Sequence, residues 1–269
     1  MIRLPQVAGQ FYPGTESSLR QEVQRLLTIG ASPAKEKALG IIAPHAGFMY
    51  SGAVAGHVYS AIQVPGTIFI LGPNHTGIGK RFSLHKQGHW RTPLGDVEVD
   101  SEIAQQLLKS CKYLDDDTAA HTYEHCLETQ LPFLQYIKSD FKIVPIVLSA
   151  YNSDAYRSLG EAIASVAKNL KKDFLIIASS DMSHYEGQKD AQKKDKKAID
   201  AILKLDELQL INCVEGLNIT MCGYIPAAIM LIAAKLLGAK EARLVKYQTS
   251  ADVTGDYNAV VGYAGVIIT

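Results

Sequence analysis

The sequence predicts an α/β fold, a three-layer α/β/α sandwich whose central sheet is mostly parallel or mixed. Short, almost wholly apolar runs alternate with longer stretches that carry apolar residues at helical spacing, which is typical of βαβ units. Several of these runs end in glycine, proline or serine followed by a histidine, as expected where a buried strand opens into a loop. We expect residues 1–269 to form a single domain, because α/β folds of this length are often one unit.

Buried strands are expected where several apolar residues follow one another. The first two, at 39–43 and 67–71, are joined by a helix near 51–62, which predicts a βαβ unit and a parallel pair. Residues 82–99 combine alternating apolar residues with proline and glycine, and so predict short strands or a hairpin at the sheet edge. Further strands are expected at 142–148, 174–178, 243–249 and 259–268.

Helices are expected where apolar residues recur every three or four positions. Thr15 can cap a helix that runs to about Leu27, and a linker with turn chemistry follows at 30–37. The segment from His121 predicts a helix in which Pro132 lies near the start or causes a bend. Other helices are expected near 100–109, 153–171, 186–204, 207–217 and 226–237, the last apolar nearly all round and therefore buried.

The composition excludes several classes of function. Apolar residues make up 47% and charged residues 20% of the chain, the balance of a globular protein with a substantial core. Lysine plus arginine equals aspartate plus glutamate at 27 each, so the basic excess that nucleic-acid binding requires is absent from the sequence. We find no membrane-spanning stretch or signal peptide and expect a cytoplasmic protein, in which the four cysteines remain thiols.

Side chains able to bind metal or move protons follow three of the expected strands. His45 and His75 follow the first two, and Asp181 and His184 follow the strand at 174–178. In an open α/β sheet, ligands bind beyond the carboxyl ends of the strands, so we expect these side chains to share one pocket. A third metal ligand is needed beside the two histidines.

Two candidates for the third ligand remain open at this stage. Asp181 and His184 form one, although Asp181 could instead cap the following turn. Cys222 is the other, because a helix amino terminus stabilises a thiolate, although a buried inert cysteine is the alternative. The sequence contains neither a Gly-x-Gly-x-x-Gly nor a Walker-type loop, and no Gly-x-Ser-x-Gly elbow, so nucleotide binding and serine hydrolysis have no local support.

Seven motifs, taken together, resemble the Memo family, named for a mediator of ErbB2-driven cell motility. They occur in family order and span nearly the whole chain, at 8–13, 42–47, 70–75, 91–95, 124–128, 179–184 and 221–223. The resemblance implies a fold similar to the class III (LigB-type) extradiol dioxygenases, with a metal pocket at one sheet edge. It implies His45, His75 and Cys222 as the metal ligands.

The same resemblance assigns roles to other residues in the pocket. His184 matches the acid/base histidine of those dioxygenases, with Asp181 beside it and His125 in a motif that faces the pocket. The residues expected to contact a substrate are Phe11, Tyr50, Asn74 and Glu128. Phe11 stands where animal members carry tryptophan, so their phosphotyrosine-peptide binding is not carried over to this chain.

One ligand separates this chain from the dioxygenases that it resembles. Those enzymes hold Fe(II) with two histidines and a carboxylate, whereas the resemblance implies a thiolate at the third position here. A thiolate is a softer donor that favours copper(I) or zinc and changes the potential of iron. We therefore expect iron or copper, with zinc as a further option, and an oxidoreductase or redox protein of unknown substrate.

Two other hypotheses compete with the redox protein. One is a non-catalytic module that binds a peptide or protein in the same pocket through Phe11 and Tyr50, and the other is a zinc hydrolase that uses a metal-bound water. The ligand is expected to be a small molecule or a peptide. Bacterial and archaeal members of the family often accompany a radical-SAM protein, which implies a functional link to such a partner.

Overall fold

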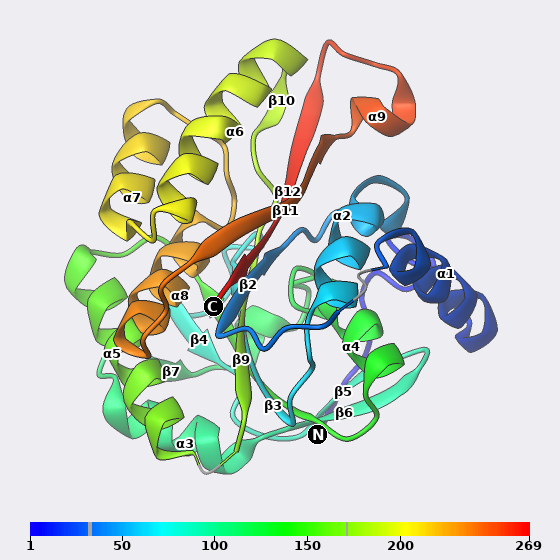
Figure 1. Ribbon diagram of the computed structural model, residues 1–269. Coiled ribbons are helices and arrows are strands. Elements are labelled where there is room, and N and C mark those ends of the chain that lie inside the picture. Colours follow the sequence, from blue (N-terminus) through cyan, green and yellow to red (C-terminus); the bar gives the residue numbers. More distant parts are fainter. Residues whose placement is uncertain (32–33, 171) are drawn as a thin grey trace.

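A mixed β-sheet runs through the protein and carries helices on both faces (Figure 1). This computed structural model describes residues 1–31, 34–170 and 172–269. Residues 32 and 33, in the expected linker 30–37, and residue 171, at the expected end of a helix, lie outside the described residues. The buried apolar side chains form one large cluster on each face of the sheet, so the predicted three-layer α/β/α sandwich is confirmed.

The described part of the sheet contains twelve strands. In spatial order the main path is β1-β5-β6-β8-β3-β9-β2-β12-β10, with β11 paired to β12 and β4 paired to β7 and β8. Their bounds are β1 Ile2–Arg3, β2 Gly40–Ala43, β3 Thr67–Pro73, β4 Phe82–Leu84, β5 His89–Thr92, β6 Gly95–Val99, β7 Asp115–Asp116, β8 Lys142–Leu148, β9 Phe174–Ser179, β10 His184–Glu186, β11 Ala242–Thr249 and β12 Val260–Ile268.

Parallel pairing forms the centre of the sheet. Strands β8, β3, β9 and β2 are parallel neighbours in that order, and every residue of β2 and β3 is buried. The predicted direct pairing of β2 with β3 is wrong, because β9 lies between them. Strand β9 is almost wholly apolar and buried, which suits a position with helices on both sides.

The helices divide between the two faces. On one face α2 Phe48–Ala61 packs on the sheet, and α1 Glu16–Ile29 and α4 Leu131–Ile137 pack against α2. The other face is covered by α3 Ser101–Ser110, α5 Ser153–Asn169, α6 Gln188–Leu203, α7 Glu207–Gly216 and α8 Tyr224–Leu236. Helix α8 is buried along most of its length, as its composition predicts, and the short α9 Ala251–Thr254 follows β11. None of the described helices is long and apolar enough to cross a membrane.

The segment after His121 differs from the predicted helix. A 3₁₀ turn, η1 Ala119–His121, ends at His121, and a second one, η2 Glu128–Gln130, precedes α4, which has Pro132 in its first turn. The reason is Glu124, whose Oε1 accepts the backbone N–H groups of the two residues that follow it, at 2.9 and 3.0 Å. These bonds replace helical ones and wrap the backbone around a carboxylate.

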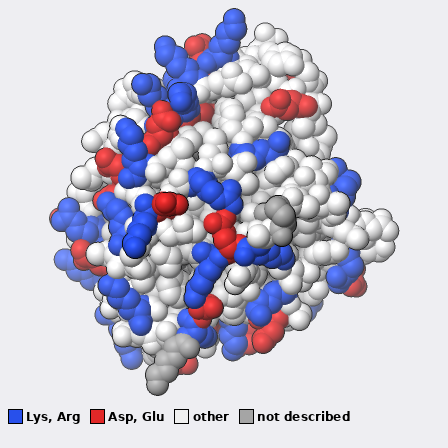
Figure 2. Space-filling view, in the orientation of Figure 1, with Lys and Arg blue, Asp and Glu red and all other residues white. Residues whose placement is uncertain are grey.

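Charged side chains of both signs cover the face shown in Figure 2. Lysine and arginine are interspersed there with aspartate and glutamate. Such mixing is the usual state of a solvated surface.

Two buried histidines lie in the core beside the only tryptophan of the sequence. The rings of His85 and His121 are 5.5 Å apart, and the Trp90 indole N–H donates to His85 Nδ1 at 3.0 Å. His121 Nε2 lies 3.1 Å from the Ser83 carbonyl oxygen, which only accepts, so this nitrogen carries the proton. Burial lowers the pKa of His85 to about 4 and that of His121 to about 3.

These pKa shifts predict acid destabilisation. Because the unfolded histidines bind protons below about pH 6.5 and the folded ones do not, the free energy of unfolding should fall as the pH drops from about 6.5 to about 4. At about 1.4 kcal/mol per pKa unit the loss is several kcal/mol. The Glu124 pKa, about 2, predicts a separate loss only below about pH 4.5.

Urea unfolding at a series of pH values measures this dependence. We expect His85→Gln to flatten it, because glutamine can accept the Trp90 N–H without binding a proton. The exposed His89 provides the control variant, His89→Gln, which should retain the wild-type slope. If the free energy of unfolding depended equally on pH in the wild type, His85→Gln and His89→Gln, the assignment of this dependence to His85 would be contradicted.

Candidate metal centre

Three neighbouring strands end at one edge of the sheet and bring the predicted histidines together. His45 follows β2, His75 follows β3, and Asp181 follows β9, which lies between those two strands. The rings of His45 and His75 have centroids 5.1 Å apart. The parallel order therefore explains why residues far apart in the sequence meet.

The ring of His45 is buried and held in one tautomer. Its Nδ1 lies 2.9 Å from Ser179 Oγ, which gives its own proton to the Cys126 carbonyl oxygen at 2.7 Å. The Gln130 side-chain amide also donates to Ser179 Oγ at 2.8 Å. Because the hydroxyl proton is already engaged, His45 Nδ1 must be the donor, which leaves a lone pair on Nε2.

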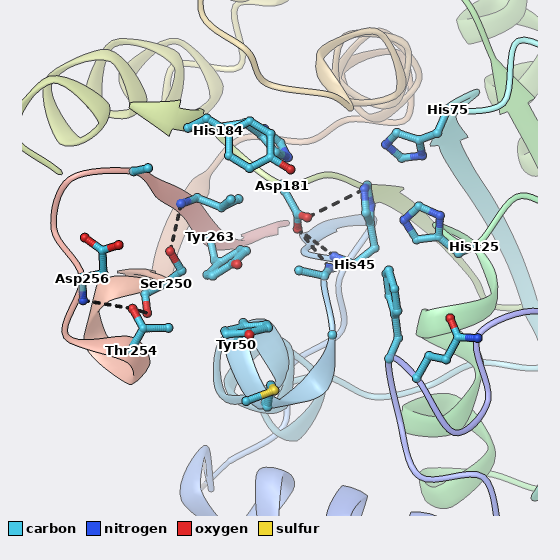
Figure 3. A pocket seen from close by; sticks show the side chains of 18 residues that line it. His45, Tyr50, His75, His125, Asp181, His184, Ser250, Thr254, Asp256 and Tyr263 are labelled. Atoms are coloured by element: carbon cyan, nitrogen blue, oxygen red, sulfur yellow. Dashed lines mark hydrogen bonds and ion pairs between the residues drawn. The ribbon is translucent and has the colours of Figure 1, made fainter. Parts of the chain in front are cut away.

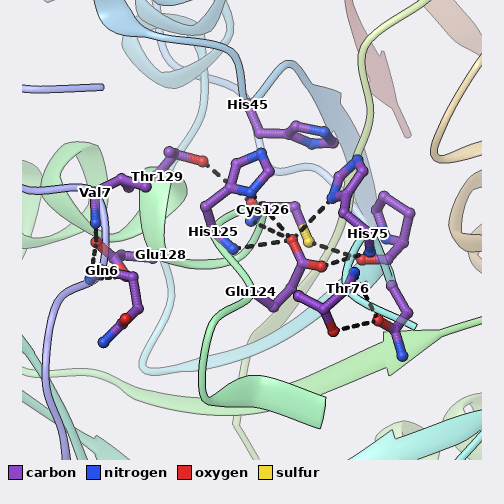
Figure 4. Close-up of polar contacts among 12 residues, drawn as sticks. Gln6, Val7, His45, His75, Thr76, Glu124, His125, Cys126, Glu128 and Thr129 are labelled. Atoms are coloured by element: carbon purple, nitrogen blue, oxygen red, sulfur yellow. Dashed lines mark hydrogen bonds and ion pairs between the residues drawn. The ribbon is translucent and has the colours of Figure 1, made fainter. Parts of the chain in front are cut away.

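His75 is oriented by a buried carboxylate. Its Nδ1 lies 2.9 Å from Glu124 Oε1, and its backbone N–H donates to Oε2 at 2.6 Å (Figure 4). Burial raises the pKa of Glu124, but hydrogen bonds and the charge of His75 outweigh it and hold that pKa at about 2. Burial also opposes protonation of His75, yet Glu124 leaves the His75 pKa raised overall. A carboxylate that accepts Nδ1–H is a common support for a metal-binding histidine, since Nε2 is then free.

His125 completes a group of three imidazoles. Its ring stacks on that of His75 with centroids 4.8 Å apart, and its edge faces the ring of Phe11 at 4.9 Å. One nitrogen from each of His45, His75 and His125 lies within 4.8 Å of the others, so the group could hold a metal ion. Burial and the neighbouring histidines keep the pKa of His45 well below its usual value, which favours the neutral ring that a metal requires.

Cys222 lies beside this group. Its Sγ is 3.3 Å from His45 Nε2 and accepts the backbone N–H of Asp181 at 3.3 Å. The following residue, Gly223, caps α8 and packs so closely that a Cβ would stand 2.5 Å from the Ser179 carbonyl oxygen. The tight packing of Gly223 therefore fixes the thiol next to the histidine.

The thiol of Cys222 is not the activated group that its place before a helix predicts. Burial, reinforced by the charge of Asp181, raises the pKa of Cys222 far above its ordinary value. The cost of desolvating the Cys222 thiolate outweighs its stabilisation by the helix amino terminus. A metal ion would have to displace this proton, and binding would then release it.

Asp181 and His184 do not form the pair that the sequence predicts. The Asp181 carboxylate accepts the backbone N–H of His45 at 2.9 Å and stands 3.9 Å from its Nε2. His184 Nδ1 instead lies 2.9 Å from the Thr220 carbonyl oxygen, so Thr220 and not Asp181 orients the ring. Since a carbonyl only accepts, Nδ1 carries the proton and Nε2 of the neutral ring is an acceptor.

A cavity of about 730 Å³ opens over this group (Figure 3). His45, His75, His125, Asp181 and His184 all line it, and so do two residues expected to contact a substrate, Phe11 and Tyr50. Figure 3 shows His45, His75 and His125 on one side and the segment from Ser250 to Asp256 on the other, with Tyr50 and Tyr263 between them. The volume is that of a typical small-molecule site.

Asn74, which was expected to contact a substrate, instead has a structural role. Asn74 accepts Thr76 N–H and Gly77 N–H and donates to the Ile78 carbonyl oxygen, so its side chain shapes the loop that carries His75.

Glu128 is fully buried behind His125, away from the residues that line the cavity. It pairs with Arg3 at 2.6 Å and accepts from Tyr12 Oη at 2.6 Å, and it also accepts the backbone N–H groups of Gln6 and Val7. This carboxylate therefore anchors the amino-terminal segment that carries Phe11.

Sequence reasoning missed several residues of the site. Glu124 orients the ring of His75, Ser179 that of His45, and Thr220 that of His184. Each of them acts through a contact between distant segments. The one feature of the local sequence that could have pointed to Glu124 is its position immediately before His125. Residues 250–258, between the strands expected at 243–249 and 259–268, carry no functional signal in the sequence, although they supply one wall of the cavity.

Glu124 offers a direct test of the arrangement. We expect Glu124→Gln to lower the metal affinity about 10- to 100-fold, because the neutral amide no longer holds the His75 ring as a carboxylate does. Competition with a chelator of known affinity measures the change. Glu98→Gln, at an exposed position on β6, is the control, and an unchanged affinity in Glu124→Gln would contradict the role given to this carboxylate.

The fold and the site together define a three-layer α/β protein in which two groups of side chains could hold a metal ion: His45 with His75 and His125, and His75 with Glu124 and Cys126. Cys222 belongs to neither group. Residues 3–267 match the sequence profile described as Memo-like protein. The chain belongs to this Memo family.

Relatives from several archaea cover the chain almost end to end. MEMO1 family proteins of Methanopyrus kandleri and Methanothermobacter thermautotrophicus are 44% and 42% identical, over 99% and 98% of this chain and 99% of each relative. One of Methanococcus vannielii is 44% identical over the whole of both chains. An uncharacterized protein of Escherichia coli K12 has a similar fold, with a TM-score of 0.55, 11% identity and coverage of 86% of this chain and all of that one.

Proposed function

We propose that this protein binds iron or copper through His45, His75 and Cys222 and acts in the cytoplasm as a metal-dependent oxidoreductase or redox protein. The observation that carries the proposal is that the rings of His45 and His75 are both held with the proton on Nδ1. The Nδ1–H of His45 donates to Ser179 Oγ and that of His75 donates to Glu124, so Nε2 of each ring keeps the lone pair with which it can bind a metal. The Cys222 thiol lies within 3.3 Å of His45 Nε2.

The donor set favours these metals over magnesium or calcium. Imidazole suits iron, copper and zinc, and a thiolate adds a soft donor, whereas magnesium and calcium prefer oxygen ligands. Zinc fits the same donors and is the further option. His125 stands within reach as an additional nitrogen donor or as a contact for a ligand.

Residues of this chain would handle protons next to the metal. Bound iron or copper would supply one-electron chemistry. His184 presents Nε2 to the cavity while Thr220 holds its Nδ1 proton, so it can take a proton from a ligand. Asp181 holds the backbone of His45 in place, and Phe11 packs against His125 and covers one side of the site.

Redox cycling tests the proposal. Protein loaded anaerobically with iron(II) or copper(I) should change its absorption or electron paramagnetic resonance spectrum on oxidation and recover on reduction. His184→Gln should cycle likewise, because it changes no proposed ligand. Failure of the loaded wild-type protein to cycle would overturn the redox assignment and leave a zinc site or a binding module.

A second candidate is a non-catalytic module that holds a small molecule, peptide or partner protein in the same cavity. It is favoured by the aromatic lining, which includes Phe11, Tyr50 and Tyr263. A radical-SAM protein is the partner proposed from the family resemblance. Ligand binding that is equally tight with and without metal would support this candidate.

A further inference from the structure

The cavity has an end that the metal site does not use. Beyond the histidines it continues to a wall formed by Ser250, Thr254 and Asp256, which precede and follow Gly255 (Figure 3). The Asp256 side chain is exposed, and its Oδ1 accepts the backbone N–H of Asn258 at 2.9 Å. Two hydroxyl groups and a carboxylate therefore stand opposite the histidines.

The side chains between the two ends are aromatic. Tyr50 and Tyr263 lie between the histidines and the Asp256 wall, Phe11 closes the metal end, and Tyr185, which is 80% exposed, stands at the rim. The faces of such rings carry negative charge density, and they attract apolar bodies and cations. Of the two tyrosines in the middle, Tyr263 is almost fully buried, so its position is fixed.

The charged side chains that line the cavity, apart from the histidines, are all acidic. Among the described residues that line the cavity, two are aspartates and none is lysine or arginine. Proteins usually bind phosphate and carboxylate groups through arginine, lysine or a helix amino terminus. A ligand with an anionic tail would therefore meet the Asp256 carboxylate without a compensating cation, whereas a ligand with a cationic tail would find a partner.

We infer that the cavity binds a small aromatic molecule that carries an ammonium group, with the ring between Tyr50 and Tyr263 and the ammonium at Asp256. The opposite end of the molecule faces His75 and His125. This inference names the substrate class of the proposed metal site and rests on that proposal for its function. The charges that select the ligand belong to the chain itself, so the preference for a cation does not require the metal.

Three probes with the same aromatic body and different charges test the inference. They are 2-phenylethylamine, which is cationic, 2-phenylethanol, which is neutral, and phenylacetate, which is anionic. Binding is measured by calorimetry or ligand-observed NMR at about pH 8. The measurements are made on metal-free protein and repeated on metal-loaded protein, because phenylacetate can also coordinate a metal directly.

We expect the metal-free protein to bind the amine at least about tenfold more tightly than either other probe, which is about 1.4 kcal/mol. Asp256→Asn should remove this preference and leave the alcohol unaffected. The exposed Asp140 provides the matched control, Asp140→Asn, which should behave as the wild type. Equal or tighter binding of phenylacetate, or an unchanged preference in Asp256→Asn, would overturn the inference.

The two proposals fail in different ways. If metal analysis of the same samples finds no metal under any loading condition while the amine preference holds, the redox proposal fails and the ligand class stands. If metal binds and cycles but the amine preference is absent, the ligand class fails and the metal site stands.

Discussion

Replacing His75 by alanine should abolish stoichiometric metal binding, with an affinity loss of more than about 100-fold. Loss of an outer hydrogen-bond partner alone typically costs 10- to 100-fold, and this change removes a donor outright. It also removes the 2.9 Å contact between His75 Nδ1 and the Glu124 carboxylate. Metal analysis after anaerobic loading and gel filtration measures the effect.

The control for this prediction is His184→Ala. His184 lines the same cavity but donates Nδ1–H to the Thr220 carbonyl oxygen and is not one of the three proposed ligands His45, His75 and Cys222, so this variant should keep its metal. Thermal unfolding of both variants separates loss of a ligand from loss of the fold. Wild-type metal content in His75→Ala would contradict the site.

The second large effect is expected at Arg3, far from any metal donor. We expect Arg3→Ala to lower the free energy of unfolding by about 3–5 kcal/mol, because it leaves the buried Glu128 carboxylate without its cation. Arg3 also donates to the carbonyl oxygens of His121 and Glu124 and lies over the Trp90 ring at 4.2 Å. Urea unfolding measures the loss.

An exposed ion pair gives the matched control. Arg20 pairs with Glu16 at 3.2 Å on the surface of α1, and Arg20→Ala should cost less than about 1 kcal/mol. The double variant Arg3→Met with Glu128→Gln should recover part of the loss, because no uncompensated charge remains. A cost below about 1 kcal/mol for Arg3→Ala would show that the buried pair is unimportant.

The central strands could be predicted because burial on both faces demands continuous apolar runs. Strands β2, β3, β8 and β9 all begin within one or two residues of their predicted positions. Their order could not be predicted in the same way. The insertion of β9 between β2 and β3 depends on packing between segments more than 100 residues apart, which leaves no local pattern.

The residues of the site also divide into those that the sequence predicts and those that it does not. His45, His75 and His184 were identified because loops after parallel strands are where ligands bind. Asn74 was misplaced because an asparagine in a glycine-containing loop satisfies its own backbone, and the sequence does not distinguish that role from ligand contact. Glu124 was missed because its importance lies in a hydrogen bond to a residue 49 positions away.

The most direct test of the account is X-ray absorption at the edge of the metal that the wild-type protein takes up. The proposed ligand set predicts nitrogen donors at about 2.0 Å and one sulfur at about 2.3 Å, the lengths known for zinc sites. The sulfur contribution should disappear in Cys222→Ala. A spectrum of nitrogen and oxygen donors alone in the wild type, unchanged by Cys222→Ala, would contradict the account.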